Sequence, residues 1–175
     1  ALAAFPLSAA TKFPARPRPR SPPLAMASWA GPLLSPQPAD SLRVLRSVCE
    51  SMRDGAKPVH WEQLEFLCPD ALPLAADILD HRSVIRCVSK ETRREFWQVS
   101  QKAKQTYCVI PGWCSCQSYS FEVLGSRNKL VCKHELAVML ATALGLGHTN
   151  ELDEEKWAAE LDLATRFSLN AHGGA

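Results

Sequence analysis

Trp113-Cys114-Ser115-Cys116, followed after fifteen intervening residues by Cys132-Lys133-His134, is the stretch that decides how this chain folds. The two short motifs offer three thiols and one imidazole, which make a full tetrahedral ligand set for Zn²⁺ at a structural site. No coordination position is left for a water or a substrate. The pattern therefore predicts a zinc-clamped binding module with Cys114, Cys116, Cys132 and His134 as the metal ligands.

Each ligand pair needs a particular backbone geometry. Residues two apart point to opposite faces of a straight strand, so Cys114 and Cys116 can share a metal only in a tight knuckle, which Pro111-Gly112 favours. Cys132 and His134 would point apart within a helix, so we expect Cys132 just before a helix and His134 in its first turn. We also expect nearby cations to offset the negative charge of three thiolates around Zn²⁺: Arg127, Lys129 and Lys133.

Catalytic alternatives have little support in the sequence. Cys132 and His134 as nucleophile and base lack an evident orienting acid, and the other histidines form no group. No Gly-rich loop that could cradle a phosphate is present. We therefore expect that the protein is not an enzyme.

The chain has seven cysteines, an odd number that favours reduced thiols over a disulfide framework. Cys49, Cys68 and Cys87 lie among apolar neighbours and are expected in the core. Cys108 is expected there too, or as a spare metal ligand, because it lies six residues before Cys114.

The net charge of +2 hides an uneven distribution. Residues 1–81 carry eight basic and eight acidic residues, residues 82–134 carry ten and three, and residues 135–175 carry two and seven, which gives balances of 0, +7 and −5. The basic segment is either an ordinary solvated surface or one that attracts nucleic acid or an acidic protein.

Composition divides the chain into four parts. We expect a disordered Pro-rich leader over 1–39, a helical part over 40–82, a β-meander with the zinc finger over 83–147, and an acidic amphipathic helix and tail over 148–175. The first methionine, Met26, is one candidate for the start of translation. No apolar run approaches the roughly 20 residues of a membrane-spanning helix, so we expect no membrane contact.

Apolar spacing predicts the elements of an α+β fold. Steps of three and four residues predict helices over about 41–53, with Asp40 or Ser41 as the N-cap, over about 61–67, and from an N-cap at Asp70 to about 79. Short runs rich in β-branched and aromatic residues predict a three-stranded antiparallel meander over 83–88, 95–99 and 106–110. A short helix over 117–124 capped by Ser118, an apolar helix over about 132–145 and an amphipathic helix over about 151–166 complete the expected fold.

The arrangement Cys-x-Cys, a variable loop and Cys-x-His resembles the SWIM zinc finger. The surrounding sequence resembles the SWIM zinc finger domain-containing protein 7 family, the small SWIM subunits of Shu-type recombination complexes, over about residues 42–145. The segments that carry this resemblance include Leu64-Glu65-Phe66-Leu67, Trp97-Gln98-Val99, Tyr107-Cys108, Cys114-Ser115-Cys116-Gln117-Ser118-Tyr119 and Leu130-Val131-Cys132-Lys133-His134-Glu135-Leu136.

This resemblance implies a nuclear, non-enzymatic zinc-binding adaptor in homologous recombination DNA repair. Such subunits pair with a RecA-fold recombinase paralogue, in a heterodimer or larger complex, and support the strand-exchange recombinase, with DNA contact that is indirect or weak. The resemblance also implies partner contacts at Ala137, Leu140 and Ala141, for which ordinary core packing is the alternative. The alternative function is direct DNA binding through the +7 segment, as in SWIM regulators of transposase-related type.

Overall fold

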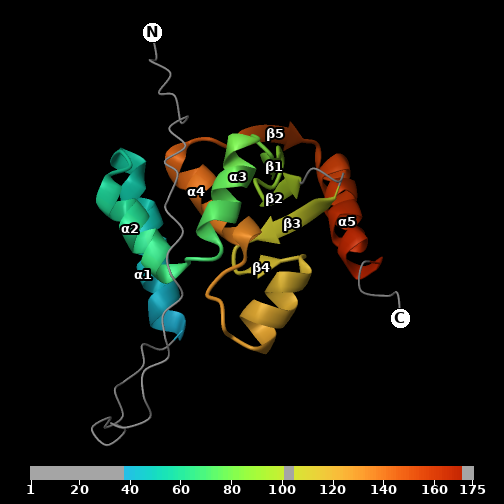
Figure 1. The fold of residues 1–175 in the computed structure, drawn as a ribbon. Coiled ribbons are helices and arrows are strands. Elements are labelled where there is room, and N and C mark those ends of the chain that lie inside the picture. Colours follow the sequence, from blue (N-terminus) through green and yellow to red (C-terminus); the bar gives the residue numbers. More distant parts are fainter. Residues whose placement is uncertain (1–37, 101–104, 171–175) are drawn as a thin grey trace, which may run out of the picture. The chain divides into compact units, whose positions relative to one another are not determined.

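The computed structural model describes residues 38–100 and 105–170, with side chains described over 40–100 and 105–165. These residues form an α+β fold around one mixed sheet of five strands, which confirms the predicted fold class (Figure 1). The expected leader lies outside the described residues, apart from Pro38 and Ala39, which begin the first helix. None of the helices in the described ranges combines the length and apolar character needed to cross a membrane.

Three helices form the N-terminal part, as predicted. They are α1 (Pro38–Ser51), which continues into a 3-10 turn at Met52–Asp54, α2 (Pro58–Leu67) and α3 (Leu72–Asp80). The predicted caps are wrong. Asp40 lies inside the first turn of α1, and the N-cap of α3 is Ala71, because the Leu72 amide donates to the Cys68 carbonyl at 2.9 Å and the preceding turn leads directly into the helix.

The sheet has the order β4-β3-β2-β1-β5. Strands β1 (Val84–Ser89), β2 (Glu95–Ser100) and β3 (Thr106–Ile110) form the predicted antiparallel meander, and the short β4 (Trp113–Cys114) extends it beside β3. Strand β5 (His148–Leu152) pairs in parallel with β1 at the other edge.

The prediction for residues 148–175 needs correction at its start. Residues 148–152 form β5, and the last helix, α5 (Glu154–Asn170), begins three residues later than expected. The sequence His-Thr-Asn-Glu-Leu shows no apolar alternation, because the strand lies at an exposed edge and only Leu152 contacts a buried cluster. Its strand conformation comes from pairing with β1.

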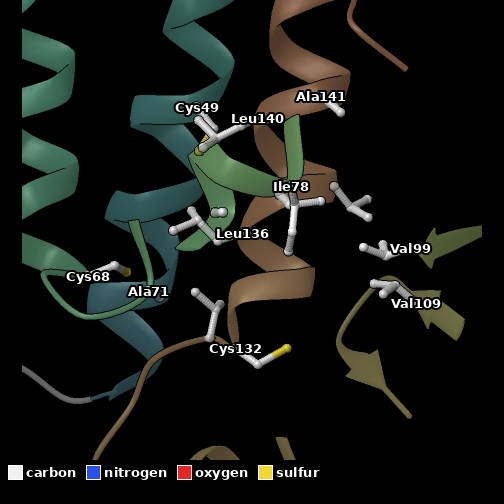
Figure 2. Close-up of a cluster of buried hydrophobic side chains, with 14 of the residues drawn as sticks. Cys49, Cys68, Ala71, Ile78, Val99, Val109, Cys132, Leu136, Leu140 and Ala141 are labelled. Atoms are coloured by element: carbon white, nitrogen blue, oxygen red, sulfur yellow. The ribbon is translucent and has the colours of Figure 1, made fainter. Parts of the chain in front are cut away.

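Two apolar clusters cover the two faces of the sheet, because successive strand residues point to opposite sides. Phe96 belongs to the cluster beneath α5, whereas its neighbour Trp97 belongs to the larger cluster beneath α4 (Lys133–Leu144). Figure 2 shows Leu136 and Leu140 of α4 between Cys49 and Ala71 of the N-terminal helices on one side and Val99 and Val109 of the sheet on the other. Helix α4 is therefore the centre of the described fold.

Burial of α4 overturns one expectation from the family resemblance. Ala137 and Leu140 are 0% exposed and Ala141 is 1% exposed, so all three are core residues. Their side chains cannot meet a partner without opening the fold. Ordinary packing, the alternative considered above, explains them.

The last helix is attached to the sheet mainly through Trp157. Its ring packs edge-on against Phe96 with centroids 5.5 Å apart, and its indole nitrogen donates to the Cys87 carbonyl at 3.3 Å. The guanidinium of Arg94 lies 4.7 Å above the same ring. A buried aromatic with a satisfied polar atom makes a strong anchor for an otherwise polar helix.

The segment after the cysteine knuckle is a π-helix, Tyr119–Gly125, where a short helix over 117–124 was predicted. Ser118 does not cap it, because its own backbone is helical and its hydroxyl donates to the Glu122 carboxylate. Tyr119 is buried and donates its hydroxyl proton to the Gly112 carbonyl, while Phe121 is 62% exposed.

Candidate metal centre

The structure brings all four predicted ligands together. Their ligand atoms lie within 4.8 Å of one another, although Cys114 and Cys116 come from the end of β4 and Cys132 and His134 from the start of α4. All four side chains are buried, with at most 3% of any residue exposed. The remaining described residues contain no other comparable group of Cys, His, Asp and Glu side chains.

The knuckle that holds the first pair begins at the predicted turn. Gly112 has φ +81°, in the region that glycine adopts without strain, and the Pro-Gly turn lets Trp113 pair with Ile110. The Ser115 amide then donates to the Cys108 carbonyl at 2.9 Å, and the Ser115 hydroxyl accepts from the Cys108 amide at 2.9 Å. These two bonds tie the knuckle to β3.

Cys116 is held where the knuckle enters the π-helix. The Tyr119 amide donates to the Cys116 sulfur at 3.3 Å, and it also donates to the Cys116 carbonyl at 3.1 Å. Backbone donors aimed at a sulfur favour its ionised form.

The second pair has the helical placement expected from the sequence. Cys132 is the N-cap of α4, and its sulfur accepts from the Glu135 amide at 3.4 Å in the manner of a capping side chain. His134 follows in the first turn. The helix N-terminus, with its partial positive charge, therefore lies beside the metal ligands.

An aromatic contact fixes the orientation of His134. The ring of Tyr107 on β3 stacks on the imidazole with centroids 4.1 Å apart and an interplanar angle of 26°. The Nδ1 atom of His134 lies 3.8 Å from the Cys114 sulfur, while Nε2 is buried without a hydrogen-bond partner among the described residues. A buried, unpaired imidazole nitrogen is costly unless it binds an ion or another ligand.

The thiols share protons unequally. Hydrogen bonds from Cys114 and then Cys132 lower the pKa of the Cys116 thiol far below its ordinary value, and His134 acts in the same direction. The hydrogen bond to Cys116, that to Cys132 and burial raise the pKa of Cys114. One sulfur is thus ready to bind as a thiolate, and metal binding would release the protons of the others.

The donor set fits Zn²⁺. Three thiols and one imidazole are ligands that zinc prefers, and four of them complete a tetrahedral structural site. Bound there, the ion would supply structural cross-linking, since these donors connect the β3–β4 hairpin to the start of α4. The orphaned nitrogen of His134 and the close approach of three buried sulfurs are the observations that support a metal.

One further expectation is wrong. Cys108 is not a spare ligand, because Tyr107 and Val109 point to the metal side of β3 and Cys108 points to the opposite face, in the cluster with Phe96. The offset of the thiolate charge by nearby cations stays a prediction: the ammonium of Lys129 pairs with Glu122 at 2.8 Å, and no ion pair of the described residues involves Arg127 or Lys133.

The sequence missed two supporting residues, Tyr107 and Ser115. A period-two reading of β3 places Tyr107 on the face of Val109, toward the core, but only the register of the folded chain shows that His134 lies against it. For Ser115, the only indication of a supporting role in the sequence was its place between two cysteines.

Fold and site together define the class of protein: a small α+β module with a SWIM-type zinc finger. The chain is 34% identical over 95 residues to zinc finger SWIM domain-containing protein 7 of zebrafish, which covers 53% of this chain and 67% of the zebrafish protein. The mouse protein of the same name is 35% identical over 83 residues, covering 46% of this chain and 54% of its own length. The chain belongs to the zinc finger SWIM domain-containing protein 7 family.

The family extends to distant eukaryotes. A Dictyostelium homolog is 24% identical over 100 residues, which covers 56% of this chain and 64% of that protein. The chain thus matches between about half and two thirds of the length of these relatives. No family model and no solved structure matches it.

Proposed function

We propose that this protein is a non-enzymatic, zinc-dependent adaptor in homologous recombination repair, acting in the nucleus. In this role it pairs with a RecA-fold paralogue and supports the strand-exchange recombinase. Membership of the SWIM family supports a zinc finger, and the recombination role is the proposal drawn from the family resemblance.

The observation that carries the proposal is the closed ligand set. Four buried donors within 4.8 Å complete the coordination of Zn²⁺, so the centre has no open position at which a substrate or an activated water could bind. A zinc ion so placed stabilises the hairpin against α4 and shapes the surface around it. A closed centre of this kind supports a binding role over a catalytic one.

The arrangement of the charges argues against direct DNA binding as the function. The basic residues at the β1–β2 turn pair with acids of the following C-terminal segment: Lys90 with Asp153 at 3.0 Å, Arg93 with Glu151 at 2.9 Å, and Arg94 with Glu154. Arg86 pairs with Glu95 on the neighbouring strand. The three pairs with the C-terminal segment therefore offset three of the seven excess positive charges, whereas Glu95 is already counted in the balance of +7.

The proposal is tested by measuring zinc content and partner binding in the same variants. Cys114→Ser and His134→Ala are expected to lose stoichiometric zinc and binding to the co-expressed RecA-fold paralogue together. Cys87→Ala, which changes a buried cysteine on the opposite face of the sheet, is the matched control and should keep both. A zinc-free variant that binds the paralogue with unchanged affinity would contradict the proposal.

A further inference from the structure

Helix α2 carries apolar side chains on two opposite faces. On the inner face, Leu64 is 0% exposed and belongs to the larger core cluster, against which Trp61 and Leu67 pack. On the outer face, Phe66 is 87% exposed and Val59 is 47% exposed. Apolar residues on more than one face are typical of a helix that is covered on more than one side. The described residues cover only the inner side of α2.

The outer residues form a straight stripe along the helix. Val59 and Phe66 are seven residues apart, which places them about 20° apart around the helix axis and about 10 Å apart along it. Glu62 and Gln63 lie between them on the same side, and both are exposed. We call Val59, Glu62, Gln63 and Phe66 the outer stripe of α2.

The position of α2 leaves this stripe open to a partner. The helix packs beside α1, and in Figure 1 these two helices stand at the opposite end of the described fold from α5. A protein bound at the stripe would therefore not compete with the contacts between α5 and the sheet.

The charge around the stripe is negative. Residues 54–80 carry six acidic residues and one basic residue, Lys57, with histidine counted as neutral, which gives a balance of −5. Lys57 is the N-cap of α2, at the end far from Phe66. Glu62 and Glu65, the two acids of α2, make no ion pair within the described residues, in contrast to the paired charges of the β1–β2 turn. These two carboxylates are therefore available to a basic partner.

We propose that the outer stripe of α2 binds a basic amphipathic helix of a partner protein. A straight stripe fits a second helix lying along it, because the side-chain ridges of one helix pack into the grooves of another. Phe66 and Val59 contact apolar side chains of that helix, and its lysines or arginines pair with Glu62 and Glu65. This inference rests on the adaptor function proposed above and specifies where the adaptor makes contact.

A second copy of this chain fits the stripe less well. Two α2 helices related by a twofold axis would place Phe66 of each against Val59 of the other. The axis would then pass between positions 62 and 63, which brings the two Glu62 carboxylates together. Like charges brought together at an interface oppose association, whereas a basic helix meets no such repulsion.

The test compares binding of full-length variants to the RecA-fold paralogue. Phe66→Ala is expected to weaken binding at least tenfold, because aromatic anchors contribute strongly to interfaces. It should unfold at the same urea concentration as the wild type, since the ring is exposed. Phe121→Ala, which removes a 62% exposed ring from the π-helix, is the matched control and should bind normally. Unchanged affinity of Phe66→Ala overturns the surface while leaving the adaptor role intact.

A charge reversal tests the sign of the partner's charge. Glu62→Lys is expected to weaken binding at least fivefold at about 100 mM salt, and less at higher salt, because exposed charges are screened. Glu155→Lys, at an exposed acid of α5 that makes no ion pair within the described residues, is the control and should bind as the wild type does. Unchanged or stronger binding of Glu62→Lys overturns a basic partner.

Two other results separate the possible failures. Light scattering that shows a wild-type homodimer lost in Phe66→Ala would give the stripe to a second copy and overturn the partner helix. If the wild-type protein binds no RecA-fold paralogue, the adaptor proposal fails, and the stripe is tested with peptides displayed on phage. Peptides rich in lysine and arginine that bind the wild type but neither Phe66→Ala nor Glu62→Lys support the surface, and their absence overturns it.

Discussion

Tyr107 is the residue outside the ligand set that contacts the metal centre most directly. Its ring stacks on His134 and holds the imidazole in place. We expect Tyr107→Ala to weaken zinc binding roughly tenfold, because groups that orient a ligand typically contribute 10- to 100-fold to metal affinity. Competition with a chromophoric zinc chelator measures this change. Tyr107→Phe keeps the ring and should bind zinc as the wild type does; equal losses in both variants would argue against stacking as the cause.

Cys108 gives the protein a pH dependence that is separate from the zinc site. Burial raises the pKa of its thiol from 9.0 to about 12. Between these values the folded chain keeps a proton that the unfolded chain has lost, so its contribution to stability is complete below pH 9 and is lost as the pH rises toward 12. The free energy of unfolding should fall by up to about 1.4 kcal/mol per pH unit from this group.

Urea denaturation at several pH values between 8 and 11 measures this dependence. Cys108→Ala should show a shallower decline than the wild type, because it lacks the titrating thiol. Val109→Ala, next along the same strand, is the control, and its curve should be lowered without a change of slope. Parallel curves for wild type and Cys108→Ala would show that this thiol does not contribute.

At the scale of the element, Trp157 is the largest apolar anchor of α5, beside the smaller contacts of Leu161 and Ala164. Trp157 is 6% exposed and contacts Phe96, Arg94 and the Cys87 carbonyl, whereas Leu163 on the same helix is 51% exposed. We expect Trp157→Ala to lower the free energy of unfolding by about 3–5 kcal/mol, as large-to-small core substitutions do. Leu163→Ala should lower it by less than about 0.5 kcal/mol. Chemical denaturation measures both, and similar costs would show that the helix is held in some other way.

The elements that the sequence predicted well are those whose own residues determine them. The meander and α4 carry dense apolar patterns, and Gly145, with φ +65°, ends α4 where the sequence placed its end. Strand β5 and the start of α3 could not be predicted, because pairing with β1 and a turn from Cys68 fix them. Local signals such as Asp70 are then overridden by contacts made elsewhere.

The four ligands of the candidate site could be named from spacing alone, because only a few residue types bind zinc and the two motifs contain them all. The residues that hold these ligands in place could not be named in this way. Tyr107 meets His134 through the packing of β3 against α4, and the side of β3 on which Cys108 lies depends on strand register. Such relations between distant segments exist only in the folded chain.

At the scale of the whole molecule, charges that are distant in sequence neutralise one another. Because three basic residues at the β1–β2 turn pair with Asp153, Glu151 and Glu154, we expect weak binding to single- or double-stranded DNA with a shallow dependence on salt. Fluorescence anisotropy over 50–300 mM salt measures it. Glu151→Gln together with Glu154→Gln should release two arginines and strengthen binding; tight, steeply salt-dependent binding by the wild type would instead support the DNA-binding alternative.

The parallel pairing of β1 with β5 also has a consequence for synthesis. The first strand of the sheet leaves the ribosome long before its outer neighbour, since β1 ends at Ser89 and β5 begins at His148. Until β5 and α5 have been synthesised, one edge of β1 is unpaired, and Phe96 and Cys87 lack their contacts with Trp157. A chain that ends at residue 147 would contain every zinc ligand but neither β5 nor α5, so we expect it to aggregate more readily than the chain that includes them.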